Sequence, residues 1–264
     1  MSNLKTHCIF GGIYNNYISL EALLEKASKE GADTFFCLGD IGGFGPHPDR
    51  VFPFIKDKED VFVMQGNYDH SIGNRLDDCA CGYVDPKDQA FAQISYDYTL
   101  QNTSDVNKDW LRDLPTNYRF NWGGKNILMA HGSPRRTNEF LWESTCSDTF
   151  ISYLLTKNEC DILFVTHTGI PWIRRLDDGR MLVNVGVIGR PPNDGSFDVD
   201  YILVHEDEKG LSVEAKRLSY DYERLAKEME DENLPDEFVE TVRTGWWTTC
   251  LEVLPSKERD IGPF

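Results

Sequence analysis

Short runs of apolar residues recur along the chain, and each is followed at once by a polar turn. Four of these runs are four residues long, and they lie at 35–38, 61–64, 127–130 and 162–165. An unbroken apolar run of this length is typical of a strand that is covered on both faces. The pattern therefore predicts buried strands of an α/β protein.

Helical spacing and hairpin patterns occupy the segments around these strands. A helix is expected to begin at Ser19 and to end at Gly31, because apolar residues recur there every three to four positions. Further helices are expected at 50–55, 86–98, 107–114, 147–157, 220–231 and 235–243. Hairpin strands are expected at 118–122, 126–130, 172–176, 181–185, 201–204 and 211–217. We expect one domain over residues 1–243, followed by a C-terminal tail over 244–264.

A possible ligand for a metal ion follows each of the four apolar runs. These residues are Asp40, Asn67, His131 and His167. Open α/β sheets bind ligands at the carboxyl ends of their strands, so these side chains are expected to converge. Carboxylate and amide oxygens combined with imidazole suit Mn²⁺, Fe²⁺ or Zn²⁺ better than Mg²⁺. The sequence therefore predicts a site for one divalent transition metal.

The charge of the chain limits what it binds. It has 27 Lys and Arg against 44 Asp and Glu, a net charge of −17, which opposes nucleic-acid binding. A phosphorylated substrate must therefore meet local positive charge, from a metal or from arginines. Arg135 and Arg136 directly follow the ligand motif of His131, so they are candidates for an oxyanion clamp, with solvated loop charges as the alternative. Arg190 is a weaker candidate for the same role.

Hydropathy indicates no membrane association. No apolar run approaches the roughly 18–20 residues of a membrane span, and the apolar run at 8–10 is too short for a signal peptide. We expect a cytoplasmic protein.

Most of the seven cysteines are expected to be reduced, as is usual in that compartment, and the exception is the pair Cys79 and Cys81. Cys8, Cys37 and Cys160 lie in apolar runs and are expected to be buried thiols. The pair Cys79 and Cys81 is favoured as part of a packed loop, with a redox pair or a soft metal site as alternatives, although two thiols alone supply too few ligands.

Several motifs in order resemble those of the calcineurin-like metallophosphoesterases, in particular the small bacterial and archaeal phosphodiesterases. They are Gly39-Asp40, Gly66-Asn67-Tyr68-Asp69, Ala130-His131-Gly132-Ser133-Pro134-Arg135, Thr166-His167-Thr168 and the segment 184–191. The resemblance implies a four-layer α/β/β/α sandwich with two mixed sheets. It also implies phosphoester hydrolysis at two metals about 3.5–4 Å apart, with Asp40 as the bridging ligand and Asn67, His131 and His167 completing one site.

The second site of that family departs from the pattern. Gly12, Tyr14 and Gly169 stand where the family carries Asp, His and His. Glycine has no side chain, and a neutral tyrosine is a poor ligand. We therefore expect a single metal. Restoring all three ligands together is expected to restore the second metal, provided that neither glycine has a positive φ.

Two further residues are candidates for catalysis. Tyr68 stands where many members of the family carry a histidine that protonates the leaving group, so it is either a neutral proton donor or loop packing. His70, two residues later, is a second candidate, although a surface position is favoured. The pair Trp246-Trp247 in the tail is expected to pack against the domain, with a partner site as the alternative.

The residues and the resemblance together favour a phosphoesterase with a reduced, single-metal site acting on a small phosphorylated substrate. One alternative is a catalytically degenerate binding or scaffold protein, a role that a retromer subunit of the family fills. Another is a single-metal enzyme of non-phosphoester chemistry in a biosynthetic pathway. Formation of a homo-oligomer is left open.

Overall fold

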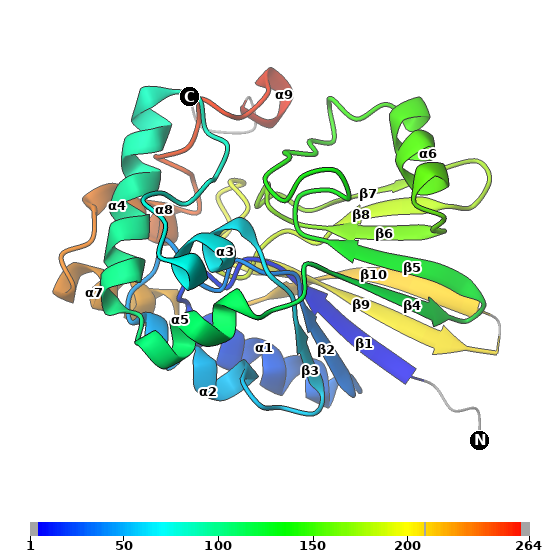
Figure 1. Ribbon diagram of the computed structural model, residues 1–264, viewed down its shortest axis with the longest axis horizontal. Helices are drawn as coiled ribbons and strands as arrows, with labels where there is room; N and C mark the ends of the chain where they lie inside the picture. The colour runs from blue at the N-terminus through cyan, green and yellow to red at the C-terminus, as the bar shows by residue number, and fades with distance from the viewer. Residues whose placement is uncertain (1–4, 209, 260–264) are drawn as a thin grey trace.

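Two mixed sheets of five strands each form the centre of the molecule in the computed structural model, which describes residues 5–208 and 210–259 (Figure 1). The first sheet has the order β10 (Gly210–Leu218), β9 (Val199–Asp207), β1 (Lys5–Phe10), β2 (Thr34–Cys37) and β3 (Val61–Val63). The second has the order β4 (Asn117–Trp122), β5 (Lys125–Ala130), β6 (Ile162–Val165), β8 (Met181–Asn184) and β7 (Trp172–Arg175). Strands β1, β2 and β3 are parallel, as are β5, β6 and β8, and the outer pairs are antiparallel.

Alternate side chains of the buried strands enter two different cores. Ile162 and Phe164 of β6 pack between the two sheets, in one core with residues of β1 and β2. Leu163 and Val165 point the other way and pack against helix α6 (Asp148–Lys157). Because both faces are covered, an unbroken apolar run is the sequence that such a strand requires. The expected α/β fold with two mixed sheets is confirmed.

Helices cover the outer face of each sheet (Figure 1). Those of the first sheet and its flank are α1 (Tyr17–Lys29), η1 (Pro48–Arg50), α2 (Phe52–Ile55), α3 (Asn67–Asn74), α4 (Pro86–Asn102), α5 (Asp105–Arg112), α7 (Tyr222–Asp231) and α8 (Asp236–Thr244). A short helix, α9 (Ser256–Arg259), lies near the end of the described chain. Residues 260–264 of the expected tail lie outside the described residues. Helix α3 was not expected from the sequence, because its polar first turn resembles a loop. Among the described residues, no helix is both long and apolar enough to cross a membrane.

One buried carboxylate joins the turns that follow β2 and β3. Asp69 accepts hydrogen bonds from the backbone N–H groups of Asp40 (2.7 Å), Ile41 (2.9 Å) and Gly66 (2.8 Å). The turns approach so closely that a Cβ on Gly66 would lie 2.3 Å from Oδ1 of Asp40, so only glycine fits there. This carboxylate therefore sets the position of Asp40.

We expect Asp69→Ala to lower the free energy of unfolding by about 3 kcal/mol or more, because it leaves buried N–H groups without an acceptor. Asp97→Ala is the matched control: Asp97 lies on the exposed side of α4 and accepts a hydrogen bond from the side chain of Gln93. The control should change the free energy by less than about 0.5 kcal/mol. Urea unfolding of both variants makes the comparison, and equal stabilities would contradict the role given to Asp69.

Candidate metal centre

Three side chains from two sheets meet at the carboxyl ends of the strands. Asp40, His131 and His167 are buried, and each offers a ligand atom within 4.8 Å of the others. Nε2 of His131 lies 3.2 Å from Oδ2 of Asp40, and Nδ1 of His167 lies 3.3 Å from Nε2 of His131. The expected convergence of these three residues is thus present.

The backbone fixes the tautomer of His131. Its Nδ1 lies 2.6 Å from the carbonyl oxygen of Leu38. A carbonyl only accepts hydrogen bonds, so Nδ1 carries the proton and Nε2 presents its lone pair to the cluster. Burial lowers the pKa of His131, but the carboxylate of Asp40 outweighs burial and holds that pKa above its ordinary value.

His167 is held neutral. Burial, followed by the neighbouring His131, lowers the pKa of His167 to about 3. Its backbone has φ 69°, a left-handed conformation uncommon for a residue with a side chain. Its Nδ1 faces Nε2 of His131 (3.3 Å), and the backbone of Cys81 and of Asn138 lies within reach of the ring. A neutral imidazole with one nitrogen turned toward a carboxylate–histidine cluster is suited to metal ligation.

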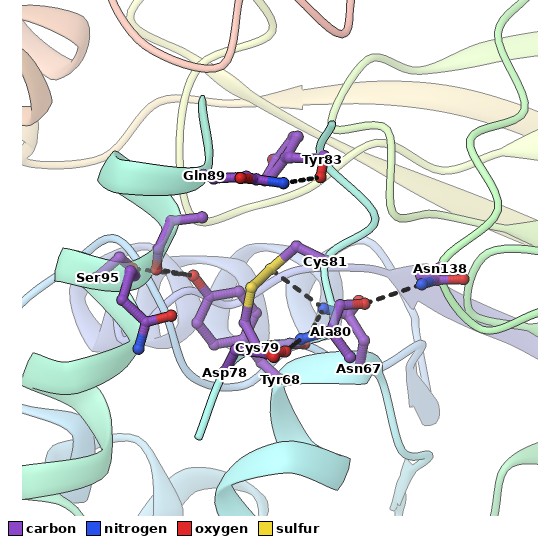
Figure 2. Close-up of a disulfide and its surroundings, with 12 residues drawn as sticks. Asn67, Tyr68, Asp78, Cys79, Ala80, Cys81, Tyr83, Gln89, Ser95 and Asn138 are labelled. Atoms are coloured by element: carbon purple, nitrogen blue, oxygen red, sulfur yellow. Dashed lines mark hydrogen bonds between the residues drawn. A yellow bond between two sulfur atoms is a disulfide. The ribbon is translucent and has the colours of Figure 1, made fainter. Parts of the chain in front are cut away.

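Asn67 opens helix α3 and is turned by a neighbouring loop. Its Nδ2 donates to the carbonyl oxygen of Cys79 (3.0 Å) and lies 3.5 Å from Sγ of Cys81 (Figure 2). The amide therefore presents Oδ1 on its other side, where this oxygen is buried without a partner in the described part of the chain. The side chain lines the same cavity as Asp40 and His167.

The loop that turns Asn67 is closed by a disulfide between Cys79 and Cys81 (Figure 2). A disulfide is one state of the redox pair that the sequence left as an alternative for these two cysteines, while Cys8, Cys37 and Cys160 are free and buried as expected.

These donors fit a divalent transition metal. Buried polar atoms normally have a hydrogen-bond partner, so an orphaned amide oxygen beside a carboxylate and two imidazoles calls for an explanation. The orphan is Oδ1 of Asn67. A cation bound by it together with Asp40, Nε2 of His131 and Nδ1 of His167 would satisfy it, and this set of oxygen and imidazole ligands suits Mn²⁺, Fe²⁺ or Zn²⁺.

A small cavity of about 50 Å³ adjoins the cluster. Its polar lining includes Tyr14, Asp40, Asn67, Tyr68, His167 and Arg190, and its apolar lining includes Phe44, Phe91 and Phe238. The hydroxyl of Tyr68 lies 3.2 Å from Oγ of Ser95 and 3.3 Å from the carbonyl oxygen of Ala92 on helix α4, and it can donate a hydrogen bond to either oxygen. Burial raises the pKa of Tyr68, so its hydroxyl stays protonated.

Two other candidates from the sequence lie elsewhere. His70 is exposed on α3, beside Gln65 and Asn74, and does not line the cavity. Arg135 is paired with Glu139 and faces a separate surface depression. Their places follow from local structure: the turn of helix α3 carries His70 away from Asn67, and the ion pair holds Arg135 on its own loop.

Comparisons with known proteins agree with this geometry. The model of the calcineurin-like phosphoesterase superfamily domain matches residues 6–209. The chain belongs to this superfamily. It is 27% identical over 244 residues to the uncharacterized protein MJ0912 of Methanocaldococcus jannaschii, covering 86% of this chain and 93% of that protein.

Two solved structures share the fold of this superfamily member. Hypothetical protein PH1004 from Pyrococcus horikoshii matches with a TM-score of 0.77 and 23% identity, over 92% of this chain and 99% of that one. A metallophosphoesterase from Sphaerobacter thermophilus matches with a TM-score of 0.73 and 22% identity, over 92% of this chain and 100% of that one.

Side chains fill the space where the superfamily resemblance implies ligands for a second metal. Gly12 has φ 35°, and a Cβ there would lie 2.5 Å from Cγ1 of Val187 and 2.9 Å from the ring of Tyr14. Gly169 has φ 79°, and a Cβ there would lie 3.1 Å from the ring of Trp247. Both glycines therefore sit where a side chain is strained or obstructed.

Trp247, from the tail, was not expected to reach the site. Its side chain is 1% exposed, and its indole Nε1 donates to the carbonyl oxygen of Pro191 (2.7 Å). Its backbone N–H donates to Oδ1 of Asn193 (2.8 Å). The doublet Trp246-Trp247 was the only sequence signal for this contact, and it carried no information about where the ring would pack.

We expect the triple variant Gly12→Asp, Tyr14→His, Gly169→His to gain no second metal, because the backbone and the packed rings exclude the new side chains. Two side chains at positive φ, with the added clashes, should lower the free energy of unfolding by about 2 kcal/mol or more. Elemental analysis and urea unfolding measure both effects. Tyr14→His alone is the control, since residue 14 already carries a side chain at φ 51°; a stable triple variant with an extra equivalent of metal would refute this expectation.

Proposed function

We propose that this protein is a metal-dependent phosphoesterase that hydrolyses a small phosphomonoester or phosphodiester with one divalent transition metal per chain. The metal would be held by Asp40, Asn67, His131 and His167. The observation that carries the proposal is the buried, unpartnered amide oxygen of Asn67 beside the cluster of Asp40, His131 and His167.

Membership in the superfamily supports phosphoester chemistry, and the composition of the cavity supports a small anionic ligand. Apolar rings and buried polar groups line the site together and give it a low local dielectric, in which charged interactions are strengthened. When bound, a divalent ion polarises a phosphoryl oxygen and lowers the pKa of its water. The chain supplies position: the N–H of Tyr68 holds Oδ1 of Asp40 at 3.1 Å, and Leu38 orients His131.

Tyr68 is the residue of this chain best placed to move a proton. Its hydroxyl is protonated, buried and on the cavity wall. We assign it the role of neutral donor to the leaving oxygen, in exchange for its present bonds to helix α4. Tyr68→Phe should then lower kcat by about tenfold or more while leaving the metal content unchanged.

We expect protein purified without chelator, then loaded with Mn²⁺, to hold one equivalent of metal per chain. The variant His131→Ala, His167→Ala should lose it, since two of four ligands are removed. His205→Ala is the control, because His205 lies on β9 and bonds to Thr6, away from the site. Two equivalents in the parent protein, or none, would contradict the single-metal proposal.

Turnover of bis-para-nitrophenyl phosphate by the Mn²⁺-loaded protein should be detectable, but orders of magnitude below that of a two-metal relative assayed beside it, because one activating cation is missing. The variant His131→Ala, His167→Ala should be inactive. A metal-loaded protein with no turnover of any phosphoester would favour the binding-protein alternative or a different reaction at the metal.

A further inference from the structure

Arg190 places a buried positive charge in the cavity. It follows β8 on the loop that begins at Val185, and its side chain is only 7% exposed. Its guanidinium carbon lies 3.5 Å from the centroid of the Trp247 ring. Nη2 would lie 3.7 Å from a Cβ on Gly169. The guanidinium thus occupies the side of the cavity where the superfamily resemblance implies a second cation.

This charge has no anionic partner among the residues that the structure describes. The guanidinium forms no ion pair or hydrogen bond with residues 5–208 or 210–259, and its Nε is buried without an acceptor. The chain carries 44 acidic residues, so carboxylates are common in it, yet none pairs with this buried arginine among the described residues. Burial of an unpaired charge is costly, and such a site is stabilised when an anion enters.

The shape of the site matches a phosphoryl group. A guanidinium that stacks on an indole face still presents its N–H groups at the edge, in a fork that fits two oxygens of a phosphate. A cavity of about 50 Å³ holds a few water molecules, since each needs about 10–15 Å³. That is room for one small tetrahedral anion between Arg190 and the metal ligands Asp40 and His167, which line the same cavity.

We propose that Arg190, stacked on Trp247, takes the place of the second metal as the cation that binds the phosphoryl oxygens of the substrate. This inference rests on the proposed function. It assigns the roles of the two metals of the superfamily to two different groups, one metal ion and Arg190. A guanidinium has donors only and cannot hold a hydroxide as a metal does. Arg190 therefore binds substrate oxygens, and activation of water is left to the single metal. Trp247 is a positioning residue, because it acts through Arg190.

The test is calorimetric titration of inorganic phosphate into the protein, both after chelator treatment and after loading with Mn²⁺. Arg190→Met removes the charge at similar volume and should weaken phosphate binding by about tenfold or more in both states. Metal content should not change. The melting temperature without phosphate should stay the same or rise, because a buried unpaired charge is gone. Arg136→Met is the control: Arg136 is exposed and lies outside the cavity, so binding should equal that of the parent.

Arg190→Lys keeps a positive charge but loses the planar fork and the stack on Trp247, so it too should bind phosphate more weakly. This variant serves as the test should Arg190→Met fail to fold. Phosphate affinity equal to the parent in a folded Arg190 variant overturns the inference.

The failure of the inference and that of the proposed function are distinguishable. If Arg190→Met binds phosphate and turns over bis-para-nitrophenyl phosphate like the parent, the inference fails while the function stands. If the parent holds no metal and hydrolyses nothing, but binds phosphate, and Arg190→Met does not bind phosphate, the proposed function fails and the anion site stands.

Discussion

Three backbone N–H groups converge on the carboxylate of Asp69, and the candidate metal centre depends on that convergence. They come from the turns after two neighbouring parallel strands, β2 and β3. By bonding both turns, the carboxylate brings Asp40 to the end of its strand and sets the first turn of α3 beside it. Within this first turn of α3, the backbone N–H of Tyr68 donates a hydrogen bond to Oδ1 of Asp40. The ligand geometry is therefore a property of the backbone as much as of the ligands.

The cavity is lined by groups that suit a cation and by one group that suits an anion. Two imidazoles, an amide oxygen and a carboxylate lie close together, and such donors suit a cation. Arg190 adds a positive charge to the same cavity, and no carboxylate of the described residues pairs with it. A ligand with a negative group, bound together with a metal ion, would interact with both.

The strands and their polar ends could be predicted because they are local. A run such as 162–165 is buried on both faces, so its unbroken apolar composition indicates a covered strand. His167 follows this strand, so it must lie at the edge where the strand ends. The place of Trp247 could not be predicted, since its contact with Arg190 spans more than fifty residues and depends on tertiary packing. Adjacency was equally uninformative for His70 and Arg135, because neighbours in sequence do not share a direction once a helix turns or an ion pair forms.

The ring that supports Arg190 comes from residue 247, whereas the match to the superfamily domain covers residues 6–209. Phe238, Thr249 and Cys250, which line the cavity, also lie outside the segment that family membership describes. Proteins grouped by the shared domain alone can therefore differ in how a charge such as that of Arg190 is held, without differing in any shared motif. For this architecture, classification by the common core and classification by chemistry are separate questions, and the answer to the second lies partly in the appended segment.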